Sequence, residues 1–272
     1  MTWKQLPPMA WNLKALLTTM NVATGPAIVT ELVLYRIKVD PTVVELSFDL
    51  EGTNHGRHGG LSKLQITLAC NTGVTHVLDV CELCKQLFLY ETRQGVSVKK
   101  IFENIQIPKV IFDSRQDCAA LHGEFGIEIQ GVIDLQLMEL GIRECSVERL
   151  WGLERCIDQY LPLSESEKRI WKFYKNGGHE YCDGDYSKWQ IRSLPEVLVD
   201  YAANDTVYMP HLYAYLMEKL KEKPEMMTLI LTESVKRVAD SQSLDFVTSG
   251  SLAPPAFFTR PCLDDEENLF KR

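Results

Sequence analysis

Three apolar segments predict the strands that open the folded part of the chain. They cover residues 43–50, 64–70 and 75–80 and are rich in β-branched side chains, as strands are. Residues 52–60 hold four glycines and separate the first two segments. An Asn-Thr-Gly run at residues 71–73 predicts a hairpin turn between the second and the third. We therefore expect three antiparallel strands.

Beyond residue 97 the spacing of apolar residues becomes typical of helices around short buried strands. Helices are expected at residues 98–105, 115–125, 134–174 with interruptions near Gly141 and Pro162, 195–221 and 225–240. Short strands are expected at residues 110–112 and 127–132, and the polar, Gly-rich residues 176–185 predict a loop. Strands that come first and helices that surround them favour an α/β architecture with a mixed sheet.

This pattern divides the chain into a main domain and its extensions. We expect an N-terminal helix and lead-in at residues 1–40, a main domain at 41–221, a C-terminal helix at 222–242 and a flexible acidic tail at 243–272. No apolar run approaches the roughly 18 residues that a membrane span needs, so no membrane partner is expected.

Composition narrows the class of protein. The 272 residues carry a net charge of −8, from 29 basic and 37 acidic side chains. This excess of acid argues against a protein that coats nucleic acid by charge alone, but not against an enzyme with a local site. Eight cysteines without a secretory signal predict reduced thiols and an intracellular place, cytoplasmic or nuclear. For the pair Cys81-x-x-Cys84 a zinc site is the alternative.

Two acids stand on the polar face of the first predicted strand. Side chains alternate along a strand, so Asp49 and Glu51 project to one side and Phe48 and Leu50 to the other. The acids come at the carboxyl end of the strand, where ligand sites of α/β sheets tend to lie. The alternative is an ordinary solvated strand face.

A third acid lies where the helical pattern predicts an apolar residue. Asp205 falls within an apolar stripe of period 3.6, and Tyr201, four residues earlier, shares its face. A buried carboxylate needs a partner. Asp205 is therefore bonded to the tyrosine, placed at the edge of the stripe, or part of a site. Ser193 and Glu196 have the spacing of a capping box at the start of this helix.

Two further aspartates occur at helix starts. Asp117 lies at the margin of an apolar stripe, in the first turn of the helix expected at residues 115–125, where an acid is ordinary. Asp134 opens the next helix and has the position of an N-cap. Neither residue indicates a site by itself.

Taken together, these segments resemble the DEDD superfamily of 3′-5′ exonucleases. Residues 48–52 look like the first motif of that family, residues 109–117 like the second, and Tyr201-x-x-x-Asp205, with Arg192 ahead of it, like the third. The third motif is similar to that of the tyrosine subgroup, which includes ribonuclease D and the Werner syndrome exonuclease domain. Within the subgroup, residues 51–61 look most like the group called exonuclease 3′-5′ domain-containing protein 1.

The resemblance implies an RNase H-like fold: a five-stranded mixed sheet, its first three strands antiparallel, flanked by helices. It also implies that Asp49, Glu51, Asp117 and Asp205 converge and hold two divalent cations, Mg²⁺ or Mn²⁺. Four carboxylates repel each other strongly without cations, and oxygen ligands suit these hard ions. Tyr201 is expected to orient the attacking water or the scissile phosphate. No organic cofactor is expected.

The partner implied by the resemblance is the 3′ end of single-stranded RNA or DNA, shortened by one nucleoside 5′-monophosphate per turnover. Arg57, His58 and Arg192 are candidates for contacts with phosphate; a solvated loop and an ion pair with an acid are the alternatives. The alternative function is a catalytically silent exonuclease fold that serves as an RNA-binding adaptor, and a further one is a protein-interaction module that uses the acidic tail. All four acids are present, which favours activity.

Overall fold

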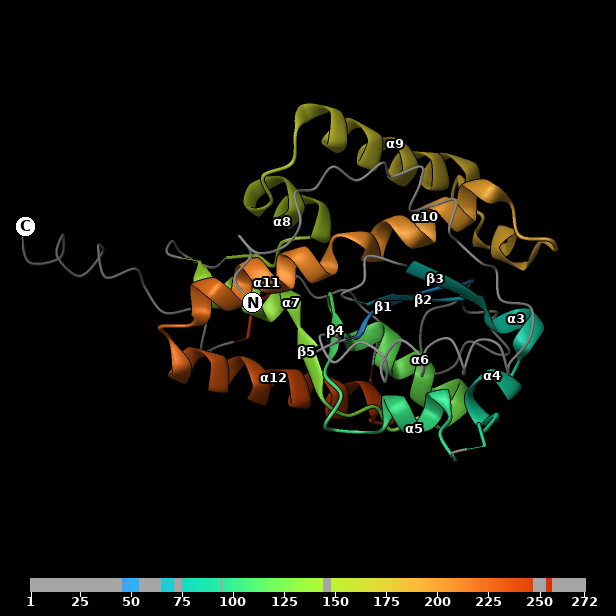
Figure 1. Ribbon diagram of the computed structural model, residues 1–272, viewed down its shortest axis with the longest axis horizontal. Helices are drawn as coiled ribbons and strands as arrows, with labels where there is room; N and C mark the ends of the chain where they lie inside the picture. The colour runs from blue at the N-terminus through green and yellow to red at the C-terminus, as the bar shows by residue number, and fades with distance from the viewer. Residues whose placement is uncertain are drawn as a thin grey trace, which may run out of the picture.

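The computed structural model describes residues 46–53, 65–70, 75–93, 95–143, 148–246 and 253–255. Figure 1 shows a twisted sheet in the middle with helices on both sides. The predicted N-terminal helix, the turn at residues 71–73, most of the predicted tail, and Arg57 and His58 lie outside the described residues.

The described strands form one sheet of five strands in the order β3-β2-β1-β4-β5. The strands are β1 (Leu46–Glu51), β2 (Gln65–Cys70), β3 (Thr75–Asp79), β4 (Lys109–Ile111) and β5 (Val132–Asp134). β1 pairs antiparallel with β2, and β2 with β3, as the sequence pattern predicted. β4 runs parallel to both β1 and β5. β1 is therefore the central strand.

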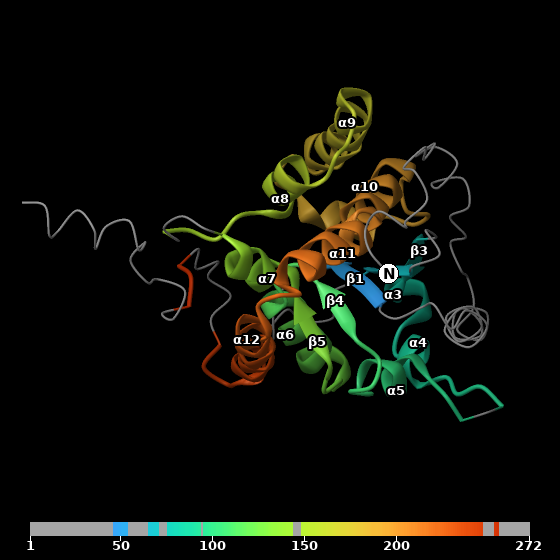
Figure 2. The ribbon, with the colours of Figure 1, turned by 60° about the vertical axis from the view of Figure 1, so that its left-hand side comes forward.

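Helices cover both faces of the sheet. One face packs against α3 (Val80–Leu83), α4 (Gln86–Leu89), α5 (Val98–Phe102) and α6 (Arg115–Phe125). The other face packs against α7 (Leu135–Ile142), α10 (Glu196–Val207) and α11 (Met209–Leu220). A further layer lies on α10 and α11: α8 (Leu153–Tyr160), α9 (Glu165–Cys182) and the 3₁₀ helix η2 (Tyr186–Gln190). Figure 2 shows α10 between the sheet and α9.

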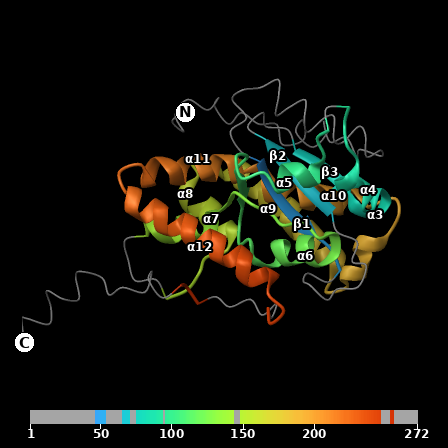
Figure 3. The same ribbon diagram turned by 90° about the horizontal axis from the view of Figure 1, so that it is seen from below.

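α12 (Pro224–Gln242) closes the side of the sheet where β5 lies. It packs against α6, α7 and β5, and Figure 3 shows it from below as it crosses α7 toward α6. Its residue Ile230 joins the core under α7 and α11, whereas Val238 joins the core under α6. One helix thus connects the cores of the two faces.

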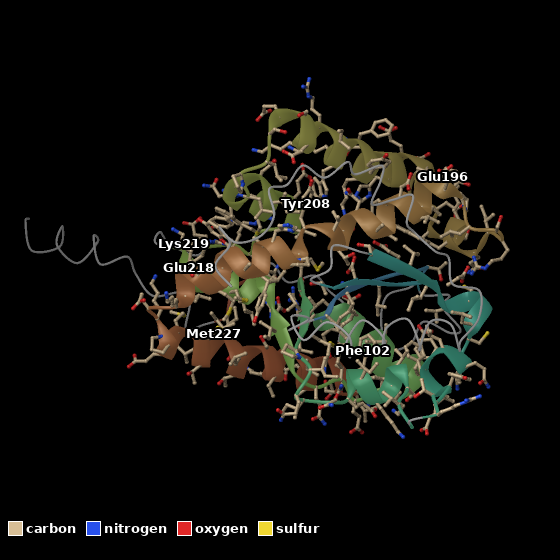
Figure 4. All side chains as sticks on the ribbon, in the orientation of Figure 1. Phe102, Glu196, Tyr208, Glu218, Lys219 and Met227 are labelled. Carbon is tan, nitrogen blue, oxygen red and sulfur yellow. The ribbon has the colours of Figure 1, made fainter. Side chains whose placement is uncertain are left out.

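The side chains of β1 divide between these two faces because they alternate along the strand. Phe48 has no exposed surface, and its ring meets that of Phe102 edge to face at 5.1 Å. Figure 4 labels Phe102 on the side of the sheet where α5 lies, and labels Tyr208 on the opposite side, between α11 and α8. Asp49 and Glu51 alternate with Phe48 along β1 and therefore point to the opposite side of the sheet, which α10 covers.

The predicted loop at residues 176–185 is wrong, because α9 continues to Cys182. Gly177 and Gly178 lie inside this helix, although each glycine weakens a helix by about 1 kcal/mol relative to alanine. A Cβ atom on Gly178 would lie 2.2 Å from Cδ2 of Tyr201. The close contact with α10 that Gly178 permits therefore outweighs the local preference for a loop.

The strand predicted at residues 127–132 is also wrong in its bounds. Only Val132 of that range belongs to β5, which continues to Asp134. Gly131 breaks the extended backbone with a φ of 66°, and a Cβ atom there would lie 2.9 Å from the carbonyl oxygen of Ile105. The apolar residues Ile127 and Ile129 are buried without pairing in the sheet.

The predicted capping box at Ser193 is contradicted as well. α10 has Pro195 as its N-cap and shows no side-chain capping bond. A proline side chain has no acceptor for such a bond, and the helix begins too late for Ser193 to supply one. A complete capping box occurs instead between Ser164 and Glu167, at the start of α9.

Candidate active site

Three acids from β1 and α10 meet on the face of the sheet that α10 covers. Asp49, Glu51 and Asp205 each have a carboxylate oxygen within 4.8 Å of the others. Asp205 is 4% exposed, in the apolar stripe of α10. Asp49 and Glu51 keep some accessible surface, so that small solutes can reach them. Residues more than 150 positions apart in the sequence thus form one cluster.

Asp117 lies beside this cluster, in the first turn of α6. Its side chain is buried, and burial raises its pKa well above the ordinary value, with further increases from the charges of Asp49 and Glu51. Asp117 is not part of the group of three, but the charges of Asp49 and Glu51 contribute to the rise of its pKa. The structure therefore brings three of the four predicted acids together, and two of these influence the pKa of the fourth.

The mutual repulsion of the carboxylates favours the binding of protons or cations by the cluster. Burial and the charge of Asp205 raise the pKa of Asp49 to about 7. Burial and the neighbouring carboxylates raise the pKa of Glu51 well above its ordinary value, and burial raises that of Asp205. Carboxyl groups with raised pKa values retain protons unless cations replace them.

These shifts predict how the stability of the metal-free chain depends on pH. Asp49 binds its proton more tightly when folded, since its pKa rises from 3.8 to about 7. Its contribution to stability is therefore complete below pH 4 and is lost as the pH rises through 7. We expect the unfolding temperature in chelator to fall between pH 5 and pH 8 and the variant Asp49→Asn to flatten this decrease. An unchanged pH profile in that variant would contradict the assignment.

The sequence analysis did not identify Lys175 of α9 as a residue of this site. Its Nζ atom lies 2.5 Å from Oδ2 of Asp205 and donates to the Tyr201 hydroxyl at 3.1 Å. Lys175 follows Lys168 and Lys172 on one face of α9, at spacings of seven and three residues. That pattern would have indicated Lys175 if the helix had been predicted to continue past residue 174.

Tyr201 is held by the packing of α9 and η2 around its ring. The ring contacts the backbone of α9 at Gly178, lies 5.3 Å from the ring of His179 and 6.1 Å from that of Trp189. Its hydroxyl group accepts a hydrogen bond from Lys175 and lies near enough to Asp205 to lower the pKa of that carboxyl group. Burial and the nearby carboxylates raise the Tyr201 pKa far above its ordinary value, so the hydroxyl remains a donor.

Asp134 fixes the backbone turn that precedes α6. Its carboxylate accepts hydrogen bonds from the backbone N–H groups of Asp113 and Ser114, at 3.1 and 3.0 Å, and Arg237 of α12 donates to it at 2.7 Å. Burial alone would raise the pKa of Asp134, but Arg237 and these hydrogen bonds lower it. The same carboxylate caps α7, which confirms the predicted N-cap. This network sets the position of the turn that carries Asp117.

Arg192 lies in an ion pair, which was one of its two predicted roles. One of its guanidinium nitrogens is 3.1 Å from the Asp79 carboxylate at the end of β3, and another donates to the carbonyl oxygens of Trp189 and Ile191. These contacts favour a role in holding the segment between η2 and α10.

The pair Cys81-x-x-Cys84 lies at α3, where the Cys84 thiol contacts the Cys81 carbonyl oxygen.

The cluster fits a divalent cation. All of its donors are carboxylate oxygens, the ligands that Mg²⁺ and Mn²⁺ prefer. Oδ1 of Asp205 is buried and has no hydrogen-bond partner among the described residues. A buried acceptor without a partner is uncommon in folded proteins and calls for a bound ion or water. The arrangement can therefore hold a divalent cation.

Comparison with known proteins assigns the family. The sequence profile of 3′-5′ exonucleases matches residues 30–221, which is most of the chain. The chain therefore belongs to the 3′-5′ exonuclease family. No helix among the described residues has the length and apolar character needed to cross a membrane.

Two curated relatives agree with this family. The piRNA biogenesis protein EXD1 of Mus musculus is 29% identical over 181 residues, which cover 64% of this chain and 29% of that protein. Protein RRP6-like 1 of Arabidopsis thaliana is 25% identical over 203 residues, which cover 73% of this chain and 27% of that protein. The chain thus spans less than a third of the length of either relative.

Solved structures share the fold. Trypanosoma brucei RNase D in complex with RNA U12 matches with a TM-score of 0.66 and 18% identity, over 91% of this chain and 82% of that one. The GMP complex of the same enzyme matches with a TM-score of 0.63 and 22% identity, over 79% of this chain and 63% of that one. Brucella melitensis NrnC with bound Mg²⁺ matches with a TM-score of 0.53 and 18% identity, over 76% of this chain and 92% of that one. The chain has the α/β, RNase H-like exonuclease fold that the motifs implied.

Proposed function

We propose that this chain is a 3′-5′ exonuclease that removes nucleoside 5′-monophosphates from single-stranded RNA or DNA with the help of two divalent cations. The observation that carries the proposal is the cluster of Asp49, Glu51 and Asp205 within 4.8 Å, with Asp117 beside it, in a chain of the exonuclease family. The structural relatives include complexes with RNA, GMP and pGG, which support a nucleic-acid substrate.

Each acid has a proposed part in holding the ions. Asp49 would help to hold both ions, Glu51 and Asp205 would help to hold one of them, and Asp117 would assist with the other. When bound, such ions supply a nucleophilic water at neutral pH and stabilise the leaving 3′ oxygen. The burial of the cluster strengthens these electrostatic interactions, because little water is present to screen them.

Tyr201 is proposed to orient the reactants. Its hydroxyl keeps its proton, since burial and the surrounding carboxylates raise its pKa, and it points toward Asp205. It therefore acts as a hydrogen-bond donor to the attacking water or the scissile phosphate, not as a base. Arg57 and His58, which follow the first motif, are proposed to contact the phosphate backbone.

The packing of Tyr201 on α9 predicts the effect of two neighbouring substitutions. In Gly178→Ala the new methyl group would lie 2.2 Å from Cδ2 of Tyr201, so the ring must move. We expect a loss of about 1–3 kcal/mol of stability and slower hydrolysis. In Gly177→Ala the methyl group would meet Val197 at an ordinary 3.5 Å. This control should gain up to about 1 kcal/mol and keep its rate. Equal effects of both substitutions on rate would contradict the role of the Tyr201 ring.

Digestion of end-labelled oligonucleotides tests the proposal. Single-stranded RNA and DNA carrying a 5′ label are incubated with the chain in Mn²⁺, in chelator, and with the variant Asp205→Ala. We expect a ladder that shortens from the 3′ end in Mn²⁺ and disappears with the chelator or the variant. A ladder that persists in chelator, or an equally active variant, refutes the mechanism. Binding without shortening would identify the silent adaptor instead.

A further inference from the structure

Lys175 brings a positive charge into the cluster of acids. Its Nζ atom forms an ion pair with Oδ2 of Asp205 at 2.5 Å and donates to the Tyr201 hydroxyl at 3.1 Å. The Lys175 side chain is 20% exposed and that of Asp205 6%, so the pair is shielded from water. The lysine therefore neutralises part of the negative charge at the point where the cation of the proposed function is needed.

An ammonium group and a divalent ion that both lie beside Asp205 repel each other. Oδ2 of Asp205 is used by Lys175, whereas Oδ1 has no partner among the described residues. The three acids reach each other within 4.8 Å, so an ion among them lies within a few ångströms of the ammonium. Two positive charges at such a separation repel strongly inside a protein.

The lysine can withdraw without disturbing the helix that carries it. Its Nζ lies 4.5 Å from the centre of the Tyr201 ring, and its flexible four-carbon stem allows the ammonium to swing toward solvent. α9 itself is held on α10 by the contact between Gly178 and Tyr201. The movement therefore involves a single side chain.

We propose that Lys175 is a resident counter-cation of the acid cluster, which a divalent ion has to displace from Asp205. The inference rests on the proposed function, because it concerns the ion-binding site of that function. The lysine offsets part of the negative charge of the metal-free site, and it lowers the apparent affinity of the site for the ion.

Metal titration tests the competition without reference to hydrolysis. Mn²⁺ binding is followed through the electron paramagnetic resonance signal of the free ion. The full chain is compared with Lys175→Met, Lys175→Arg and the control Lys172→Met, whose lysine pairs with Asp158 and Glu154 of α8. We expect Lys175→Met to bind Mn²⁺ on the order of tenfold or more tightly. Lys175→Arg, which keeps the charge, and Lys172→Met should resemble the unmodified chain.

The outcomes separate this inference from the proposed function. Unchanged or weaker Mn²⁺ binding by Lys175→Met would show that the lysine only supports the structure and would overturn the inference alone. An unmodified chain that binds no Mn²⁺ would overturn both proposals. Should Lys175→Met fail to fold, Lys175→Gln removes the charge but keeps a donor for Tyr201, and the same increase in affinity is expected.

Discussion

Replacement of Asp49 by asparagine should abolish hydrolysis and at the same time raise the unfolding temperature of the metal-free chain. The carboxylate of Asp49 is the proposed ligand of both ions, and metal ions contribute several kcal/mol to the stabilisation of the transition state, so the rate should fall on the order of a thousandfold or more. The charge is unfavourable without the ions, because burial and Asp205 oppose the ionisation of Asp49. An amide of the same shape removes that repulsion.

Two measurements on the same variant check this prediction. The rate of shortening of a labelled oligonucleotide is measured in Mn²⁺, and thermal unfolding is followed at pH 8 in chelator. The matched control is Asp158→Asn, which changes an aspartate of α8 that pairs with Lys172 on the surface; exposed pairs of this kind contribute about 0–1 kcal/mol. Asp158→Asn should change neither quantity. A less stable Asp49→Asn in chelator would contradict the repulsion argument.

The largest loss of stability is expected for Asp134→Ala. Asp134 has no exposed surface and accepts hydrogen bonds from Ser114 and Arg237. Its removal leaves Arg237, only 8% exposed in its side chain, without its principal charge partner. Breaking a buried pair in this way typically costs about 3–5 kcal/mol. We therefore expect the unfolding temperature to fall by roughly 10 °C.

The activity of Asp134→Ala should fall as well, because the turn before Asp117 loses its anchor. Thermal unfolding of this variant is compared with that of Asp158→Ala, which breaks the exposed ion pair on α8 and should cost less than about 1 kcal/mol. In the double variant Asp134→Ala with Arg237→Met, part of the stability should return, since no buried charge is left unpaired. A single variant as stable as Asp158→Ala would refute the anchoring role of Asp134.

Much of the architecture could be predicted from the sequence because local and tertiary preferences agree there. β1 alternates between apolar and polar residues, and the interruptions expected near Gly141 and Pro162 fall where α7 and α8 end. α6 has the predicted bounds, with Gly126 in the left-handed conformation that ends the helix. Asp205 was notable because a carboxylate interrupts an apolar stripe, and it lies in the site.

The missed features depend on contacts between distant segments. Lys175 could not be assigned because Gly177 and Gly178 favour a loop locally, and only the Tyr201 ring explains why the helix continues past them. The contact of Arg237 with Asp134 could not be predicted from local spacing, since Asp134 lies 103 residues earlier in the sequence. Spacing within one helix or strand predicts which side chains share a face, but not which face of another element they meet.

The bond between Asp134 and Arg237 also bears on how the chain matures during synthesis. Ribosomes add about 5–20 residues per second, so Arg237 follows Asp134 by roughly 5–20 s. Throughout that interval the Asp134 carboxylate of β5 has no Arg237 to pair with. The growing polypeptide can therefore complete the contact that anchors the turn before Asp117 only after α12 has been synthesised.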